Sequence, residues 1–426
     1  IYDVVQFVDE EDKRSDFLDK IFLHPVFGLV SLAVMMFVVF QAVFSWAAPF
    51  MDGIESFFGW LGEVIGENIS HPLLNSLIVD GIIAGAGGVV VFLPQILILF
   101  LFILILEESG YLPRAAFLLD KLMFSAGLSG RAFIPLLSSF ACAVPGIMAT
   151  RSIADPRDRL TTIMVAPLMT CSARLPVYAL LIAAFIPNQT VWGMFNLQGL
   201  VLFGLYMAGI VSALGVSFVL KFLQKDKSEH VLLMELPSYR FPDLKSVWIG
   251  LLDRAKIFLK RVGGIIFALS ILLWFLCTFP QPPEGATLPA IDYSFAGMLG
   301  HVLQPIFAPV GFNWQIVIAL IPAMAAREVV VAALGTVYAL SAVDEDAMSQ
   351  GLAALISGGG ELGWSLATGL SLLVWFIYAP HCLATLATVK RETGSWRTVS
   401  FMTVYLFGLA YLMSFLTYQT ASYLLG

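Results

Sequence analysis

Three of the four cysteines in this sequence stand beside a proline that would interrupt a helix. These are Cys142, which Pro145-Gly146 follows, and Cys171 and Cys382, which Pro167 and Pro380 precede. Proline removes a backbone donor and leaves a carbonyl oxygen free, so each interruption offers a thiol together with unpaired oxygens. The fourth, Cys277, has no such neighbour, and we expect it only to fill the core.

Other donor groups accompany the interruptions: Ser138, Ser139, Thr170, Met169, Met324 and His381. Sulfur, nitrogen and oxygen donors together suit a borderline divalent ion such as Fe²⁺, Zn²⁺ or Mn²⁺ better than Na⁺ or a sugar. Each residue also has a simpler explanation. A free cysteine packs as a small hydrophobe, core filling is favoured for both methionines, the serines can bond back to the preceding turn, and the histidine can lie at the membrane interface.

Acidic residues add a second candidate set. Glu328 lies in the middle of an apolar segment, where we predict a cation ligand or counter-ion. Glu107 and Glu108 end another apolar run, and with Asp120 they could line an acidic exit at the cytoplasmic face. A solvated helix end is the favoured explanation for these three. The sequence thus predicts a softer half of a metal path at Cys142 and Cys171 and a harder half at Glu328.

The elements that must position these residues are membrane helices. The chain has 426 residues, of which 59% are hydrophobic and only 12% charged, against roughly 25% charged residues in a soluble domain. Seven runs are long enough to cross about 30 Å of hydrocarbon: 25–49, 88–106, 161–186, 198–222, 262–280, 366–389 and 398–424. Two more, 131–150 and 315–340, carry proline, glycine or charge in mid-run and are predicted to be broken or re-entrant.

Lysines and arginines set the orientation. They fall before the first span, between the second and third, from Lys221 to Arg261, and in 390–397, whereas 51–87, 187–197, 281–314 and 341–365 contain none. Because basic loops stay inside, the N-terminus is predicted to be cytoplasmic. Only Arg174 and Arg327 remain at membrane depth, where a structural and a functional role are equally open.

The two halves share an order of features. A Gly pair opens an apolar span at 87–104 and again at 263–276. A broken segment follows each, and then a span opened by Ala-Pro with a nearby cysteine, at 166–176 and 379–387. The predicted topology relates the halves by inversion, as in secondary transporters. We therefore predict an all-α polytopic membrane protein, an inverted repeat with two broken or re-entrant segments.

Several long motifs resemble the membrane region of the FeoB family of ferrous iron transport proteins. They are LEESGYLPRAAFLLDKLM (106–123), GLSGRAFIPLLSSFACAVPGIMATR (127–151), APLMTCSARLPVY (166–178) and KRETGSW (390–396). The resemblance covers nearly the whole chain, including the two Gate segments of that family. It implies Fe²⁺ import across the bacterial inner membrane, with Cys142, Cys171 and Cys382 as candidate iron-path residues.

The resemblance also implies partners. An N-terminal cytoplasmic GTP-binding domain in cis would supply GTP and Mg²⁺ binding, and a small cytoplasmic regulatory protein and a homo-oligomer are further possibilities. Nucleic acid is not expected. This chain starts at Ile1 and contains no G-x-x-x-x-G-K-[ST], so we expect no GTP hydrolysis by the chain itself. It also has Ala143 where many members carry Asn.

These considerations divide the chain into six predicted parts. They are a cytoplasmic connection (1–24), a first span with an external amphipathic segment (25–70), a first Gate repeat (71–222), a basic amphipathic cytoplasmic loop (223–261), a second Gate repeat (262–397) and a last span (398–426). Two other functions remain open: a Gate-type transporter of a nucleoside-like organic solute, and a membrane sensor or scaffold without transport.

Overall fold

The computed structural model confirms an all-α polytopic membrane protein. It describes residues 13–91, 93–125, 128–187, 189–191, 195–223, 239–282, 290–324, 327, 329–337 and 364–425. Within these ranges the only sheet is a small antiparallel hairpin of β1 (Thr190–Val191) and β2 (Phe195–Asn196). Four of the described helical stretches are long and apolar enough to cross a membrane, or five if one strongly bent pair counts as a single span.

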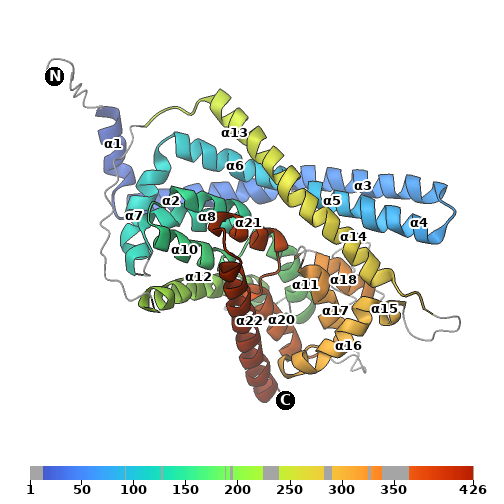
Figure 1. The fold of residues 1–426 in the computed structure, drawn as a ribbon. Helices are drawn as coiled ribbons and strands as arrows, with labels where there is room; N and C mark the ends of the chain where they lie inside the picture. The colour runs from blue at the N-terminus through green and yellow to red at the C-terminus, as the bar shows by residue number, and fades with distance from the viewer. Residues whose placement is uncertain are drawn as a thin grey trace.

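A long helical hairpin forms the first part of the chain. After α1 (Lys13–Phe22), α2 (Phe27–Gln41) continues through a π-helical turn into α3 (Ala48–Asn68). The chain then returns through α4 (Pro72–Ser76), a second π turn, α5 (Ala84–Val90) and α6 (Leu93–Glu108), packed along α3 (Figure 1). The predicted span 88–106 is therefore only the end of a 37-residue stretch, Pro72–Glu108.

The first broken segment is confirmed. It follows α7 (Tyr111–Ser125) and consists of α8 (Phe133–Ala141) and α9 (Ala143–Ala149), separated by the extended backbone of Cys142. The two short helices pack tightly: a Cβ added to Gly146 would lie 2.7 Å from the carbonyl oxygen of Pro135, which is too close for a side chain. The Pro-Gly pair thus lets α9 fold closely against α8.

Two predicted spans, 161–186 and 366–389, each contain an interruption at their cysteine. The first divides into α10 (Pro156–Val165) and α11 (Leu175–Phe185), with two 3₁₀ turns flanking extended residues between them. The second divides into α20 (Leu366–Tyr378) and α21 (Leu383–Thr393). The prediction that all three cysteines lie at helix interruptions is therefore confirmed.

The connection between the halves differs from the predicted boundary at 261/262. After α12 (Leu197–Leu223), α13 (Leu244–Ile257) continues through a π turn into α14 (Gly264–Thr278), so the amphipathic part and the apolar part form one rod (Figure 1). Asp243 accepts hydrogen bonds from two backbone N–H groups of the first turn of α13, which fixes where the helix begins.

The second half contains the other predicted broken segment. After α15 (Ala290–Tyr293), α16 (Phe295–Phe307) and α17 (Trp314–Ala323) meet at 104°, and α17 ends just before α18 (Val329–Val337). The break between α17 and α18 confirms the expectation for 315–340 over its described residues. The last helix, α22 (Trp396–Leu425), packs along α20, and the main core lies among these helices and α10–α12.

Candidate functional site

Arg327 joins three of the four helix interruptions. It stands between α17 and α18, and its Nε donates a hydrogen bond to the carbonyl oxygen of His381 at 3.0 Å. Its Nη1 donates to the Sγ of Cys171 at 3.1 Å. The backbone N–H of Leu383 also donates to the carbonyl of Met324 at 3.1 Å. The breaks in α10–α11, α17–α18 and α20–α21 therefore meet at one junction, which we call the Arg327 junction.

A second guanidinium supports the interruption at Cys171. Arg174 is fully buried, and it donates to the carbonyl oxygens of Pro167 at 3.0 Å, Met169 at 3.2 Å and Leu168 at 3.4 Å. These carbonyls belong to the unwound stretch and have lost regular helical partners. Arg174 thus holds the unwound backbone, a structural role.

Two buried nitrogen atoms at the junction lack a hydrogen-bond partner among the described residues: Arg174 Nε and His381 Nδ1. Buried polar groups are normally satisfied, and exceptions call for a bound species or water. The junction is therefore polar enough to receive an ion or water, unlike the surrounding core.

Cys142 and Cys382 lie together in different surroundings. Both pack, with Met148, against Val144 and Ala384, in a small apolar cluster between α9 and α21. Cys142 also lines a cavity between these helices, α6 and α13.

The imidazole of His381 has a structural role, because it accepts a hydrogen bond from Trp375. Trp375 Nε1 donates to His381 Nε2 at 2.8 Å, so this nitrogen's lone pair is occupied. The proton of the neutral ring then lies on Nδ1, which leaves neither nitrogen free to bind a metal in this conformation. Only the backbone carbonyl of His381 takes part in the junction.

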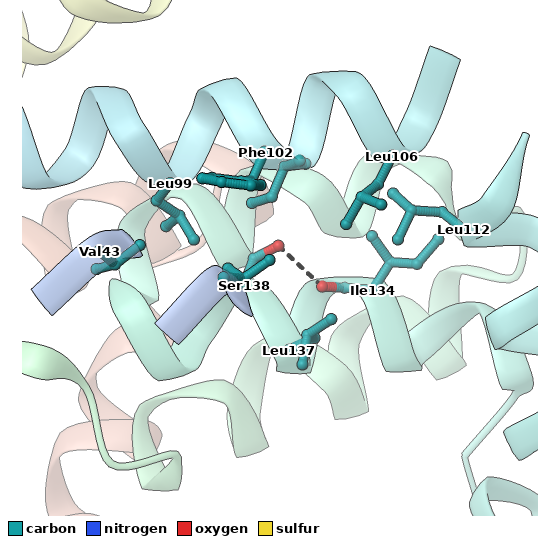
Figure 2. A pocket seen from close by; sticks show the side chains of 10 residues that line it. Val43, Leu99, Phe102, Leu106, Leu112, Ile134, Leu137 and Ser138 are labelled. Atoms are coloured by element: carbon teal, nitrogen blue, oxygen red, sulfur yellow. Dashed lines mark hydrogen bonds between the residues drawn. The ribbon is translucent and has the colours of Figure 1, made fainter. Parts of the chain in front are cut away.

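The two serines before Cys142 bond back to the preceding helical turn, as the simpler explanation predicted. Ser138 Oγ donates to the carbonyl of Ile134 at 2.9 Å, and Ser139 Oγ donates to that of Pro135 at 2.8 Å. Figure 2 shows Ser138 in a pocket between α2, α6, α7 and α8, where its neighbours, such as Leu99, Phe102 and Leu137, are apolar. Neither hydroxyl is presented to the junction as a free ligand.

The remaining predicted donors divide between core and junction. Met169 is buried in the main core, as the simpler explanation has it. Met324 contributes its backbone carbonyl to the junction. Glu328, the predicted harder ligand, lies outside the described residues.

The predicted acidic exit does not form one cluster. Glu108 accepts from the backbone N–H of Asp243 at 3.0 Å and so ties the end of α6 to the start of α13. Asp120 accepts from the N–H of Gly130 at 2.8 Å, and Glu107 is exposed. In the described part of the chain, no three His, Cys, Asp or Glu side chains are grouped so as to hold a metal ion.

An ionic contact ties α21 to the first half. Glu392, whose side chain is only 2% exposed, accepts from Arg151 at 2.6 and 2.8 Å and from Arg159 at 3.0 Å. The hydrogen bond to Glu392 raises the pKa of the Arg151 guanidinium. Arg151 lies in the link between α9 and α10, and Arg159 lies in α10. This contact therefore holds α21, which begins next to Cys382, beside these two elements.

Arg327 and Arg174 were not among the predicted site residues, although the sequence places both at membrane depth. A lone arginine at membrane depth is costly, and that cost was the available signal. Trp375 gave no such signal, because buried aromatic residues are common in any membrane helix. Its role depends on contacts that only the fold creates.

Comparisons with known proteins agree with this architecture. A family model described as nucleoside recognition (Gate) matches residues 89–185 and 259–396, and one described as the C terminus of ferrous iron transport protein B matches 202–254. No solved structure gave a significant match.

Three curated relatives cover most of the chain. It is 44% identical over 413 residues to a Fe(2+) transporter FeoB of Leptospira interrogans, covering 94% of this chain and 59% of the relative. It is 37% identical over 422 residues to the Fe(2+) transporter FeoB of Campylobacter jejuni, covering 98% and 67%. It is 38% identical over 440 residues to a Porphyromonas gingivalis fusion of Fe(2+) transport protein A with Fe(2+) transporter FeoB, covering 95% and 51%. The chain spans about three fifths of the length of its first relatives. These matches establish that the chain belongs to the FeoB family of ferrous iron transport proteins.

Proposed function

We propose that this chain forms the membrane pathway through which Fe²⁺ is imported across a bacterial inner membrane. The observation that carries the proposal is the meeting of the helix interruptions, which brings Cys171, Cys382 and freed carbonyl oxygens into one region. Interrupted helices at membrane depth are the usual way in which transporters build an ion site. The names of the relatives supply the identity of the ion.

The ion would pass from thiol to thiol instead of resting in a closed cage. The described residues contain no group of three His, Cys, Asp or Glu side chains that could bind a metal ion together. We therefore expect weak binding at each thiol, from which the ion can dissociate. A thiol must lose its proton to bind a metal, and Fe²⁺ accepts sulfur together with carbonyl oxygen. Cys142 and Cys382 would form one station and Cys171 the next.

A nucleoside-like solute is less well supported. Recognition of a nucleobase needs hydrogen-bonding groups presented to its edge, whereas the junction presents thiols and a guanidinium that already has partners. The relatives named above are Fe²⁺ transporters. We therefore favour the metal ion.

A GTP-binding domain in cis on the cytoplasmic side would control transport by moving α1. Asp19 of α1 pairs with buried Arg114 of α7 at 2.5 Å, and this guanidinium lies 3.8 Å from the ring centroid of Tyr239. A movement of α1 would thus reach α7 and the segment before α13. The relative that is a fusion with Fe(2+) transport protein A supports a protein partner, and we expect this partner to be a small cytoplasmic regulatory protein. A homo-oligomer stays a prediction.

Uptake measurements test the function. Proteoliposomes that contain the full-length protein with this chain should take up radioactive Fe²⁺ under reducing conditions, faster with GTP than without. Cys142→Ser and Cys171→Ser should each lower uptake about tenfold or more, because a hydroxyl is a poor ligand for a borderline metal. Cys277→Ser is the matched control, since Cys277 packs against a separate apolar cluster. Absence of uptake by the parent protein would exclude the function. Full uptake by both cysteine variants would exclude a path through the thiols but would leave the transport function standing.

A further inference from the structure

The contact between Arg327 and Cys171 places a cation where a metal ion would bind. Arg327 is only 4% exposed, and its Nη1 lies 3.1 Å from the Cys171 sulfur. A metal–thiolate bond is about 2.3 Å long. A divalent ion on this sulfur would therefore lie within a few ångströms of the guanidinium, and the two positive charges would repel strongly in a membrane interior.

A second buried guanidinium adds positive charge near this contact. Arg174 is close enough to Arg327 for their charges to interact, and both are buried. Among the described residues no carboxylate forms an ion pair with Arg327. Arg174 is committed to three backbone carbonyls, so Arg327 is the guanidinium that would have to move.

A displacement of Arg327 would also affect the interruption between α20 and α21. The same guanidinium holds the carbonyl of His381, and the neighbouring Met324 carbonyl holds the N–H of Leu383 at the next interruption. If the guanidinium leaves Cys171, its bond to the α20–α21 break is strained or lost as well. Removal of one contact would therefore loosen two interruptions together.

We propose that Arg327 is a tethered cation that occupies the Cys171 metal position in the closed state, and that a divalent cation must displace it to pass. The guanidinium would then act as a gate that sets how readily metal enters this station. This proposal rests on the proposed function, because it assigns a gating residue to the same path.

Two measurements on the full-length protein test the gate. The first is the rate at which iodoacetamide alkylates Cys171, read by mass spectrometry of its peptide. The second is Co²⁺ affinity, read from the thiolate-to-metal absorption band under reducing conditions. A neighbouring guanidinium also favours the thiolate form of a cysteine, so the variants are compared at a pH where the Cys171 thiol is fully ionised in each. Under that condition we expect alkylation and Co²⁺ affinity in Arg327→Gln each to rise about tenfold or more. The rise in Co²⁺ affinity should disappear in the double variant with Cys171→Ser, which removes the metal-binding thiol.

A conservative variant separates charge from shape. Arg327→Lys keeps the charge but lacks the fork that reaches two acceptors, so Cys171 should alkylate faster while Co²⁺ affinity stays within about threefold of the parent. This variant also keeps the test decisive if Arg327→Gln does not fold. Unchanged alkylation in Arg327→Lys, or unchanged alkylation and affinity in Arg327→Gln, would overturn the gate.

Uptake of radioactive Fe²⁺ by the same preparations tells the two proposals apart. If the parent transports Fe²⁺ while Arg327→Gln leaves Cys171 and Co²⁺ binding unchanged, the gate is wrong and the path stands. If the parent does not transport, the function is wrong, and alkylation still decides whether Arg327 covers Cys171. If Co²⁺ binds to no variant, Cys171 is not a metal station and the gate is overturned as well.

Discussion

The thiols lie in two regions that are built in opposite ways. Cys142 and Cys382 share a small apolar cluster, and Cys142 lines a cavity. Cys171 instead accepts a hydrogen bond from the buried guanidinium of Arg327. The first region depends on close packing of short helices, and the second on hydrogen bonds from arginines to unwound backbone. The difference is between a region held by apolar packing and one held by hydrogen bonds from arginines.

The largest effect is expected at the polar region. Arg174→Met would leave the carbonyls of Pro167, Leu168 and Met169 buried without donors. Such orphaned groups cost about 1–3 kcal/mol each, so we expect a loss of about 3–5 kcal/mol in the free energy of unfolding. Thermal unfolding in detergent, with Arg174→Lys as the conservative control, measures it. A stability equal to that of the parent would mean that the unwound segment does not depend on this arginine.

A smaller effect is expected at the apolar region. In Gly146→Ala the new methyl group would lie 2.7 Å from the carbonyl oxygen of Pro135 and would also meet the side chain of Ser139. Overpacking of this kind costs about 1–3 kcal/mol, and we expect α9 to shift away from α8 and alter access to Cys142. The matched control is Gly204→Ala, whose added Cβ has no neighbour within 4 Å. If both variants behave alike, close packing does not define this region.

The smallest effect is expected for the serine in the neighbouring pocket. Because the Ser138 hydroxyl donates to the carbonyl of Ile134 in the preceding turn and its pocket is apolar, Ser138→Ala should change the free energy of unfolding by at most about 0.5 kcal/mol. Fe²⁺ uptake should also remain at the parent level. A loss of uptake comparable to that of Cys142→Ser would instead show that the Ser138 hydroxyl contributes to the ion path. It would also weaken the distinction between the apolar and the polar region.

The sequence predicted the interruptions well because they have local causes. Pro145-Gly146, Pro167 and Pro380 each stop a helix through their own backbone chemistry, so the positions of Cys142, Cys171 and Cys382 at breaks follow from neighbours in the chain. The order of broken segments in the two halves was also visible, although their inverted relation stays a prediction. Helix continuity was harder to predict, since the π turn at 258–263 lets the amphipathic and apolar parts form one rod.

The contacts that define the site could not be predicted in the same way. Arg327 and Cys171 are 156 residues apart, and no local pattern pairs them. The occupation of His381 Nε2 by Trp375 depends on two rotamers, and the use of Glu108 to anchor α13 depends on how two distant helices meet. Sequence alone therefore identified which residues could act, while the fold decided which of them are free.

A structure of the protein with Fe²⁺ bound under reducing conditions, with the ion located by its anomalous scattering, tests the central claim most directly. The account predicts a peak about 2.3 Å from the Cys171 sulfur, as expected for metal–thiolate bonds, with Arg327 withdrawn from that sulfur. An ion found only at Glu107, Glu108 or Asp120, or one bound while Arg327 still contacts Cys171, would contradict it.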